Sequence, residues 1–354
     1  MKKINILEVT LRDGSYAINF SFTAADTANI CKKLEEIGFE YIEIGHGIGL
    51  NASNFDKYGR AVATDEEYMI AAEGALKKAK YGMFCIPGIA KLEDLDVAAK
   101  HNMGFVRIGT NVTQIEESES FIKKAKDNGF FVGANFMKSY ALPPEKFAEK
   151  VKLSEKYGAD MVYLVDSSGG MFSNDIRRYY EAIRKVSDIP LGFHGHDNLG
   201  LALSNSLEAI ELGFEFIDSS MQGLGRSSGN TATELLVAAL IKKKQNVGID
   251  FLKLLNAGHE YITPLLKTRG RAPLDIISGY ADFHSSYMHK IHKYSSAYNI
   301  DPALLIIELC KIDKVNADDK LLEEIAKRIK KEESICLTKY GFDRYFGGEQ
   351  DDKR

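Results

Sequence analysis

The chain has 354 residues, of which 45% are hydrophobic and 27% are charged. This length suits one barrel of roughly 250 residues with a smaller appendage better than it suits a single average domain. The formal net charge of −4 excludes a strongly basic surface, so neither a nucleic acid nor an anionic membrane is expected as a partner. No apolar run approaches the roughly 18 residues that a membrane span needs.

The cysteines and the N-terminus point to the cytoplasm. The four cysteines are scattered and include no C-x-x-C pair: Cys31, Cys85, Cys310 and Cys336. This pattern suits a reducing compartment and gives no sign of a zinc ribbon. The apolar run at the start of the chain is too short for a signal peptide and is interrupted by Glu8.

Short β-rich runs recur along the first 244 residues. We expect eight strands, at Ile4–Val9, Tyr41–Ile44, Gly82–Ile86, Phe105–Ile108, Phe130–Ala134, Met161–Val165, Leu191–His194 and Phe216–Asp218. Most are near-continuous apolar runs, which is typical of parallel strands covered on both faces.

Amphipathic segments separate most of these strands. We expect helices at Thr23–Ile37, Leu92–His101, Glu117–Asn128, Pro144–Tyr157, Asn174–Ser187 and Leu201–Leu212. Several end in a glycine just before the next strand, as helix C-caps do. Eight strand–helix units predict an α/β fold that closes into a (β/α)₈ TIM barrel, and an open doubly wound sheet is the alternative that the periodicity leaves.

The character of the sequence changes after residue 244. No further β-rich run recurs, and helical periodicity is found at Phe251–Leu266, Ser285–Tyr298, Pro302–Lys311 and Asp318–Lys331. We therefore predict a barrel domain over residues 1–244 and a helical C-terminal domain over residues 245–354.

Candidate metal ligands follow two of the expected strands. Asp13 lies in T-L-R-D-G directly after the first strand, and His194 and His196 lie in H-G-H-D-N at the end of the seventh. Residues i and i+2 of a strand point to the same side, and the active site of a barrel lies at the carboxyl ends of its strands. Two imidazoles and a carboxylate form a metal set with open positions for water and substrate.

Five motifs, in this order, resemble the DRE-TIM metallolyases, and most closely the 4-hydroxy-2-oxovalerate aldolases, which are class II pyruvate aldolases. The motifs are T-L-R-D-G, E-I-G-H-G-I-G-L, D-S-S-G-G, H-G-H-D-N-L-G and G-R-S-S-G-N-T, at residues 10–14, 43–50, 166–170, 194–200 and 225–231. The resemblance continues into S-G-Y-A-D-F-H-S-S-Y at residues 278–287, so it covers nearly the whole chain.

This resemblance implies a role for several residues. Asp13, His194 and His196 would ligate Mn²⁺, with Mg²⁺ or Co²⁺ as alternatives, and Asn230 would ligate the metal or support it. Arg12 would stabilise the enolate oxygen, and Ser167 would hold the pyruvate carboxylate. His46, just after the second strand, could line the substrate site or be structural, and Glu43 is expected to anchor Arg12 or a neighbouring group.

The residues expected to move a proton depart from the family pattern. The pyruvate aldolases usually carry a histidine two residues after the T-L-R-D-G glycine, where this chain has Tyr16. They carry a tyrosine in the C-terminal segment, where this chain has His284. We hypothesise an exchanged pair, with His284 as the base and Tyr16 as its hydrogen-bonding partner, because a neutral imidazole accepts a proton at physiological pH.

The predicted function is metal-dependent cleavage of a 4-hydroxy-2-oxo acid to pyruvate and an aldehyde, or its formation from these two compounds. An acyl-CoA-dependent Claisen synthase is an alternative, although such enzymes usually read T-L-R-D-G-E-Q. A non-catalytic metal-binding partner subunit is another. The resemblance also implies an acylating aldehyde dehydrogenase as a partner, and we expect a homo-oligomer.

Overall fold

The computed structural model describes residues 3–266, 273–329, 342 and 345–347. Its centre is a closed barrel of eight parallel strands in sequence order. The strands are β1 (Asn5–Glu8), β2 (Tyr41–Ile44), β3 (Lys80–Cys85), β4 (Phe105–Asn111), β5 (Phe131–Met137), β6 (Met161–Asp166), β7 (Leu191–Gly195) and β8 (Phe216–Ser219). Because β1 pairs with β8 from Asn5↔Phe216 to Glu8↔Ser219, the (β/α)₈ prediction is confirmed and the open sheet is excluded.

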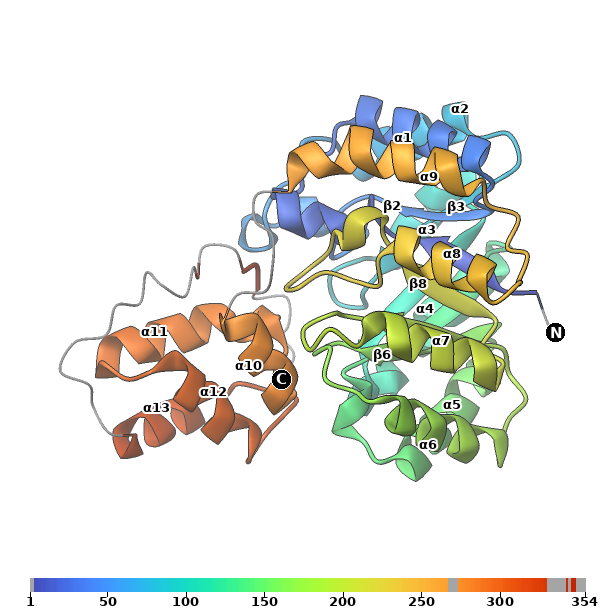
Figure 1. The fold of residues 1–354 in the computed structure, drawn as a ribbon. Helices are drawn as coiled ribbons and strands as arrows, with labels where there is room; N and C mark the ends of the chain where they lie inside the picture. Colours follow the sequence, from blue (N-terminus) through green and yellow to red (C-terminus); the bar gives the residue numbers. More distant parts are fainter. Residues whose placement is uncertain (1–2, 267–272, 330–341, 343–344, 348–354) are drawn as a thin grey trace.

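Helices surround the barrel (Figure 1). They are α1 (Ala24–Ile37), α2 (Asp65–Ala75), α3 (Leu92–Lys100), α4 (Glu119–Asp127), α5 (Pro144–Tyr157), α6 (Ser173–Arg184), α7 (Ala202–Leu212), α8 (Thr233–Lys242) and α9 (Phe251–Ala257). Local chemistry fixes α1 at both ends, since Thr23 and Asp26 form a capping box and Gly38 ends the helix at a φ of 115°. We did not predict α2, although Thr64 and Glu67 form the same kind of capping box at its start.

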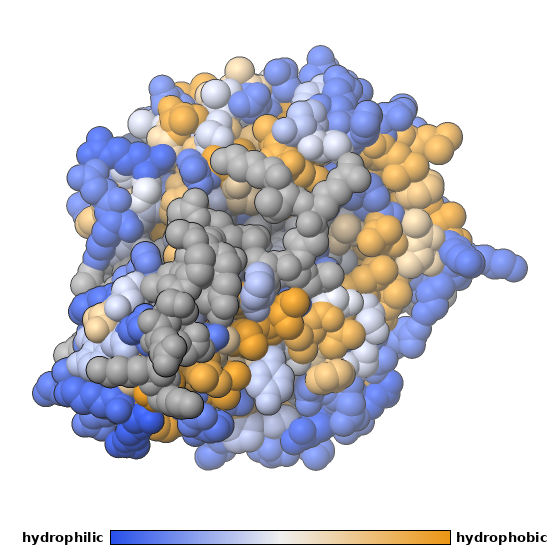
Figure 2. All heavy atoms as spheres, turned by 60° about the vertical axis from the view of Figure 1, so that its left-hand side comes forward, coloured by the Kyte–Doolittle hydropathy of each residue, from blue (hydrophilic) through white to orange (hydrophobic). Residues whose placement is uncertain are grey.

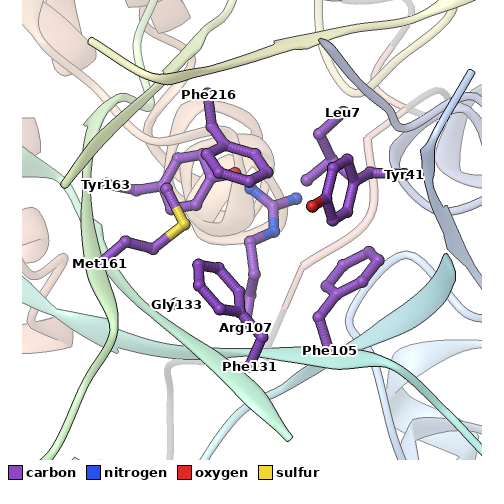
Figure 3. Close-up of a pocket in the computed structure, with 9 residues that line it drawn as sticks. All are labelled: Leu7, Tyr41, Phe105, Arg107, Phe131, Gly133, Met161, Tyr163 and Phe216. Atoms are coloured by element: carbon purple, nitrogen blue, oxygen red, sulfur yellow. The ribbon is translucent and has the colours of Figure 1, made fainter. Parts of the chain in front are cut away.

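Aromatic side chains fill the amino-terminal end of the barrel. Phe105, Phe131 and Phe216 come from the starts of three strands and line a small pocket there. Figure 3 shows the Arg107 guanidinium among these rings, and its carbon lies 4.8 Å from the centre of the Tyr163 ring. Substrates therefore have to reach the barrel interior from the opposite end, where the strands finish.

The C-terminal helices form a second lobe beside the barrel (Figure 1). They are α10 (Pro273–Ala281), α11 (Met288–Tyr298), α12 (Pro302–Cys310) and α13 (Asp319–Arg328), and they share their own hydrophobic core. The helical extension is thus confirmed, and residues 330–331 and Cys336 lie outside the described residues. The domain boundary after residue 244 stays a prediction. Beyond it, Leu254 and Ala257 of α9 still belong to the barrel core.

Hydrogen bonds join the two lobes. The Lys138 ammonium, after β5, donates to the Val315 carbonyl at 2.7 Å, and the Asn198 amide donates to the Asp275 carbonyl at 2.9 Å. On the face shown in Figure 2, hydrophobic residues form a patch with hydrophilic residues on either side of it. None of the described helices is long and apolar enough to cross a membrane.

Glu8 is buried on β1, and its carboxylate accepts bonds from the Thr10 hydroxyl and the Met221 N–H. Among the described residues, no cationic side chain bonds to it. Burial raises the pKa of Glu8 to about 7, although these hydrogen bonds oppose the shift. The folded protein therefore binds this proton more tightly than the unfolded chain does. The stabilisation is fully present below the unfolded pKa of about 4.5 and is lost as the pH rises through about 7.

We expect Glu8→Gln to remove this pH dependence, which amounts to about 3 kcal/mol. Urea unfolding at pH 5 and pH 8 measures the difference in unfolding free energy between the variant and the parent. The exposed Glu36 of α1, replaced by glutamine, is the control. Equal pH slopes in the parent and the Glu8 variant would contradict the shift.

Candidate metal and active site

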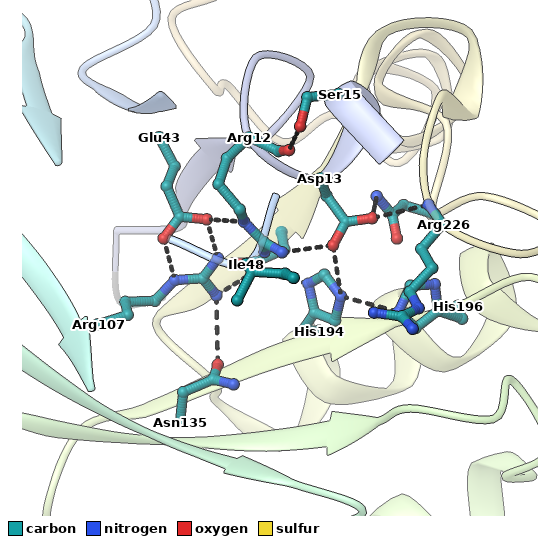
Figure 4. Close-up of polar contacts among 12 residues, drawn as sticks. Arg12, Asp13, Ser15, Glu43, Ile48, Arg107, Asn135, His194, His196 and Arg226 are labelled. Atoms are coloured by element: carbon teal, nitrogen blue, oxygen red, sulfur yellow. Dashed lines mark hydrogen bonds and ion pairs between the residues drawn. The ribbon is translucent and has the colours of Figure 1, made fainter. Parts of the chain in front are cut away.

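The structure brings the three expected metal ligands together at the carboxyl end of the barrel (Figure 4). Asp13 opens the 3-10 helix η1 (Asp13–Ile18), His194 lies on β7, and His196 follows β7 directly. All three are buried, and their ligand atoms lie within 4.8 Å of one another. The two histidine Nε2 atoms are 3.4 Å apart, and His194 Nε2 is 3.9 Å from Asp13 Oδ2.

The other ring nitrogen of each histidine faces an acceptor. His194 Nδ1 lies 2.7 Å from Asp218 Oδ2, and His196 Nδ1 lies 3.2 Å from the Gly229 carbonyl oxygen. With both Nδ1 atoms donating, both Nε2 atoms carry lone pairs that face each other across 3.4 Å. Such lone pairs repel unless a cation lies between them, so the donor set fits a transition metal held through Nε2.

Asn230 adds a second sign of a cation. Its Nδ2 donates to Asp13 Oδ1 at 3.1 Å. Its Oδ1 is buried, and no described residue makes a hydrogen bond to it. A buried carbonyl oxygen of this kind ordinarily has a partner, so it is available to a metal or to a ligand of that metal.

Electrostatics keeps the ligands in their binding forms. Burial opposes ionisation of Asp13, but Arg12 and His196 lower its pKa below the ordinary range. Burial lowers the pKa of His196 to about 4, although Asp13 opposes this shift. At neutral pH the site therefore offers a carboxylate and a neutral imidazole, which are the forms that bind metals.

Arg12 is held beside the metal ligands by two acids. Its Nε donates to Glu43 Oε2 at 2.6 Å and its Nη1 donates to Asp13 Oδ2. The guanidinium carbon also lies 5.0 Å from the centre of the Phe84 ring. The expectation that Glu43 anchors Arg12 is confirmed, and the guanidinium is fixed beside the candidate metal ligand Asp13.

A second arginine continues this network. Arg107 donates from Nε to Glu43 Oε1 at 2.7 Å and from Nη1 to Asp218 Oδ2. The chain of ion pairs thus runs from Arg12 through Glu43, Arg107 and Asp218 to His194, and Figure 4 shows its first part, from Arg12 through Glu43 to Arg107. Burial would raise the pKa of Glu43, but Arg107 and Arg12 lower it, so the carboxylate stays charged between the two guanidinium groups.

Sequence analysis missed Arg107 and Asp218 as site residues. The sequence did contain a sign of their burial and pairing, because each is a charged residue inside an otherwise apolar strand, in F-V-R-I and in F-I-D-S. Charged groups are rarely buried unless they are paired, so such a residue predicts an internal partner.

Tyr16 and His284 both lie near Arg226. The Arg226 guanidinium carbon is 4.7 Å from the centre of the Tyr16 ring, and Arg226 Nε donates to Ser285 Oγ at 2.9 Å, next to His284. Burial, followed by the charges of Arg226 and Lys138, lowers the pKa of His284 well below 6.5. The imidazole is therefore neutral at physiological pH, and a hydrogen bond between Tyr16 and His284 stays a prediction.

The two other expected substrate residues differ in their surroundings. Ser167 is half-buried after β6, and its hydroxyl accepts the Lys138 N–H at 2.9 Å. His46 is fully buried, with Nε2 3.1 Å from the Gly59 carbonyl oxygen and Nδ1 accepting the Ile48 N–H at 3.1 Å. Both ring nitrogens of His46 are thus bonded to the main chain, which favours its structural reading.

Comparison with known proteins agrees with this geometry. The HMGL-like family model matches residues 3–260. A 4-hydroxy-2-oxovalerate aldolase of Carboxydothermus hydrogenoformans is 37% identical, over 93% of this chain and 98% of the relative. The protein of the same name in Moorella thermoacetica is 36% identical, over 93% and 97%.

A solved structure gives the same result. The N-terminal domain of a putative aldolase from Bacteroides vulgatus has a TM-score of 0.70 and 29% identity, over 83% of this chain and 98% of that chain. The matched barrel carries the Asp–His–His set, and the chain belongs to the HMGL-like family. Within that family it is similar over nearly its full length to proteins named 4-hydroxy-2-oxovalerate aldolase.

Proposed function

We propose that the chain is a metal-dependent aldolase that cleaves a 4-hydroxy-2-oxo acid to pyruvate and an aldehyde, or catalyses the reverse condensation. The observation that carries this proposal is the buried Asp13, His194 and His196 set with the Arg12 guanidinium bonded to Asp13. The names of relatives that match along the whole chain support the choice of substrate.

Asp13, His194 and His196 would hold the metal, with Asn230 as a further ligand or support. Two imidazole nitrogens favour a borderline transition metal, so Mn²⁺ ranks before Mg²⁺, and Co²⁺ is an alternative. When bound, the ion supplies Lewis-acid polarisation of the 2-oxo acid.

Arg12 supplies the directed charge. As the C3–C4 bond breaks, its electron pair moves to C3 and is delocalised into the C2 oxygen, and the enolate then takes up one proton at C3 to give pyruvate. A guanidinium already held by Glu43 and Asp13 stabilises that developing charge without reorganising. Ser167 is proposed to bind the pyruvate carboxylate, and the closed amino-terminal end of the barrel keeps water away from one side.

His284 is proposed to take the proton from the C4 hydroxyl as the aldehyde carbonyl forms. Its Nδ1 lies 2.7 Å from Ser286 Oγ and 3.2 Å from the Ser286 main-chain nitrogen, which donates to it. For Nε2 to accept a proton, Nδ1 must carry one, and Ser286 Oγ can accept it. In the condensation direction Nε2 returns this proton, and the imidazole is again neutral with its one proton on Nδ1, where Ser286 Oγ can accept it.

Replacing His284 by alanine is expected to lower kcat by about 10²-fold, because a positioned proton acceptor contributes that much or more. Steady-state cleavage rates measure the loss. His292→Ala, at an exposed position of α11, is the matched control and is expected to leave the rate unchanged. A loss of less than about tenfold would exclude His284 as the base.

The test of the proposed function is pyruvate release from 4-hydroxy-2-oxovalerate in the presence of Mn²⁺ and in excess EDTA. Release that depends on Mn²⁺ supports the aldolase. If longer 4-hydroxy-2-oxo acids are also inert although Mn²⁺ binds, condensation of acetyl-CoA with a 2-oxo acid tests the Claisen synthase. If both reactions fail, a non-catalytic subunit remains.

We also propose a partner and a location. The C-terminal helices expose Ile276, Leu304 and Ile312, and such apolar side chains could contact an acylating aldehyde dehydrogenase or a second copy of the chain. Co-purification with the dehydrogenase and light scattering test these two partners. Cys31, Cys85 and Cys310 are free thiols, which supports the proposed reducing cytoplasm.

A further inference from the structure

The loop that follows β8 contacts two of the four proposed metal residues and contains a third. In Gly225–Thr231, the Arg226 main-chain N–H donates to Asp13 Oδ1 at 3.0 Å, and the Gly229 carbonyl accepts from His196. The loop also supplies Asn230. A Cβ atom at Gly225 would lie only 2.5 Å from the Asn230 amide nitrogen, so the loop is packed closely against the ligands.

The side chain of Arg226 reaches the C-terminal part of the chain. Its Nε donates to Ser285 Oγ at 2.9 Å, and its Nη2 donates to the Phe346 carbonyl at 2.6 Å. The face of the guanidinium covers the Tyr16 ring. One buried planar group therefore joins the barrel to two C-terminal segments that lie 59 and 120 residues further along the sequence.

Both segments are placed where they affect the site. Ser285 lies between His284 and Ser286, so its position sets where the proposed base points. The Phe346 ring packs on Phe20 with its centre 5.0 Å away, and Phe20 in turn contacts Tyr16 at 5.3 Å. The tail segment thus closes the apolar wall on the Tyr16 side of the site.

A second contact of the same loop acts in parallel. The Ser227 hydroxyl donates to Asp275 Oδ1 at 2.9 Å, and the same oxygen accepts from the Tyr345 hydroxyl at 2.8 Å. Adjacent residues of the loop therefore hold α10 and the tail segment. Of these two loop residues, Arg226 is the one that contacts the segment of His284 and the ring of Tyr16.

We propose that Arg226 is a positioning residue that fastens the Ser285 and Phe346 segments over the metal ligands and so aligns His284 for proton transfer. Its effect on the reaction rests on the proposed function, whereas the closure itself does not. The choice of arginine follows from geometry, since a planar guanidinium donates in two directions while its face covers a ring, and a lysine ammonium cannot do all three.

The structure separates closure from metal binding. Asp13 is held by the main-chain N–H of residue 226, which any residue except proline retains. Arg226→Met is therefore expected to bind Mn²⁺ within about threefold of the parent affinity, while the segments containing Ser285 and Phe346 lose their donor. Aldol cleavage is expected to fall by about 30-fold in kcat, which is a fraction of what a proton acceptor contributes.

The experiment compares Arg226→Met with the parent protein and with Arg178→Met, an exposed arginine of α6. Hydrogen exchange measured by mass spectrometry follows residues 285–288 and 345–347 in the Mn²⁺-loaded proteins. Faster exchange of both segments with Mn²⁺ affinity retained supports closure by Arg226. Unchanged exchange overturns the proposal, and so does a loss of Mn²⁺ binding, because the side chain would then serve the metal site itself.

Two further measurements keep the test independent of folding and of the substrate. Arg226→Lys keeps the charge and can donate to one acceptor, so exchange at only one segment is expected to rise. Exchange of the pyruvate C3 protons in D₂O needs the metal, Arg12 and a base for the C3 proton, which the buffer can supply, so it is expected to survive in Arg226→Met. If the parent itself cleaves no 4-hydroxy-2-oxo acid, the proposed function fails, and the hydrogen-exchange result still decides the closure.

Discussion

Replacing Asp13 by asparagine is expected to abolish tight Mn²⁺ binding and to lower kcat about 10⁴-fold. A Lewis acid contributes several kcal/mol to such a reaction, and each 1.36 kcal/mol is a factor of ten in rate. The asparagine oxygen can keep the bonds from the Arg226 and Asn230 N–H groups. Its amide nitrogen, however, would face the Arg12 guanidinium and His194 Nε2, where the parent carboxylate oxygen lies.

Mn²⁺ titration followed by electron paramagnetic resonance measures the affinity, and pyruvate release measures the rate. Because the deficit lies in affinity, millimolar Mn²⁺ is expected to restore part of the activity. Asp175→Asn, at the start of α6, is the control for the loss of one carboxylate. A variant that binds Mn²⁺ as tightly as the parent would exclude Asp13 as a ligand.

The second large effect is expected at Arg12. Arg12→Gln removes the donor aimed at the developing enolate charge, and the loss of one such donor costs up to about 10³-fold in kcat. The fold is expected to survive, because Arg107 still neutralises Glu43. Arg12→Lys is expected to recover little, since an ammonium cannot reach Glu43 and Asp13 together in the manner of the guanidinium.

This effect differs from that of the Asp13 variant in the metal affinity. Removing a buried positive charge from beside Asp13 is expected to leave Mn²⁺ binding unchanged or tighter, while kcat falls. Isothermal titration with Mn²⁺ and steady-state kinetics with and without saturating metal separate the two variants. Rescue of the Arg12 variant by added metal would show that the guanidinium serves metal binding and not the reaction.

The sequence predicted the parts of the fold that depend on local patterns. The apolar strand runs and the glycine caps were sufficient for the barrel, but β4 and β5 each end three residues beyond the expected ends. The residues beyond the expected ends include the buried polar Asn111 and Asn135. Periodicity cannot detect burial of that kind.

The candidate site was predictable where one strand carried its own signal. Two histidines on one side of the chain at the end of β7 predict that they ligate the same metal ion. Arg107 and Asp218, by contrast, acquire their roles only through partners on other strands. His46 shows the opposite limit, because its ring is bonded to the Gly59 carbonyl and the Ile48 N–H. Which contacts a loop makes with its own main chain does not follow from its residue types.

The pairing of β1 with β8 has a consequence for synthesis on the ribosome. Asp13 is made 217 residues before Asn230, its hydrogen-bond partner. A nascent chain that lacks β8 holds one ligand at one open edge and two histidines near the other, so it has no complete metal site. The metal ion is therefore expected to bind only after β8 has closed the barrel, and not to assist the earlier steps of folding.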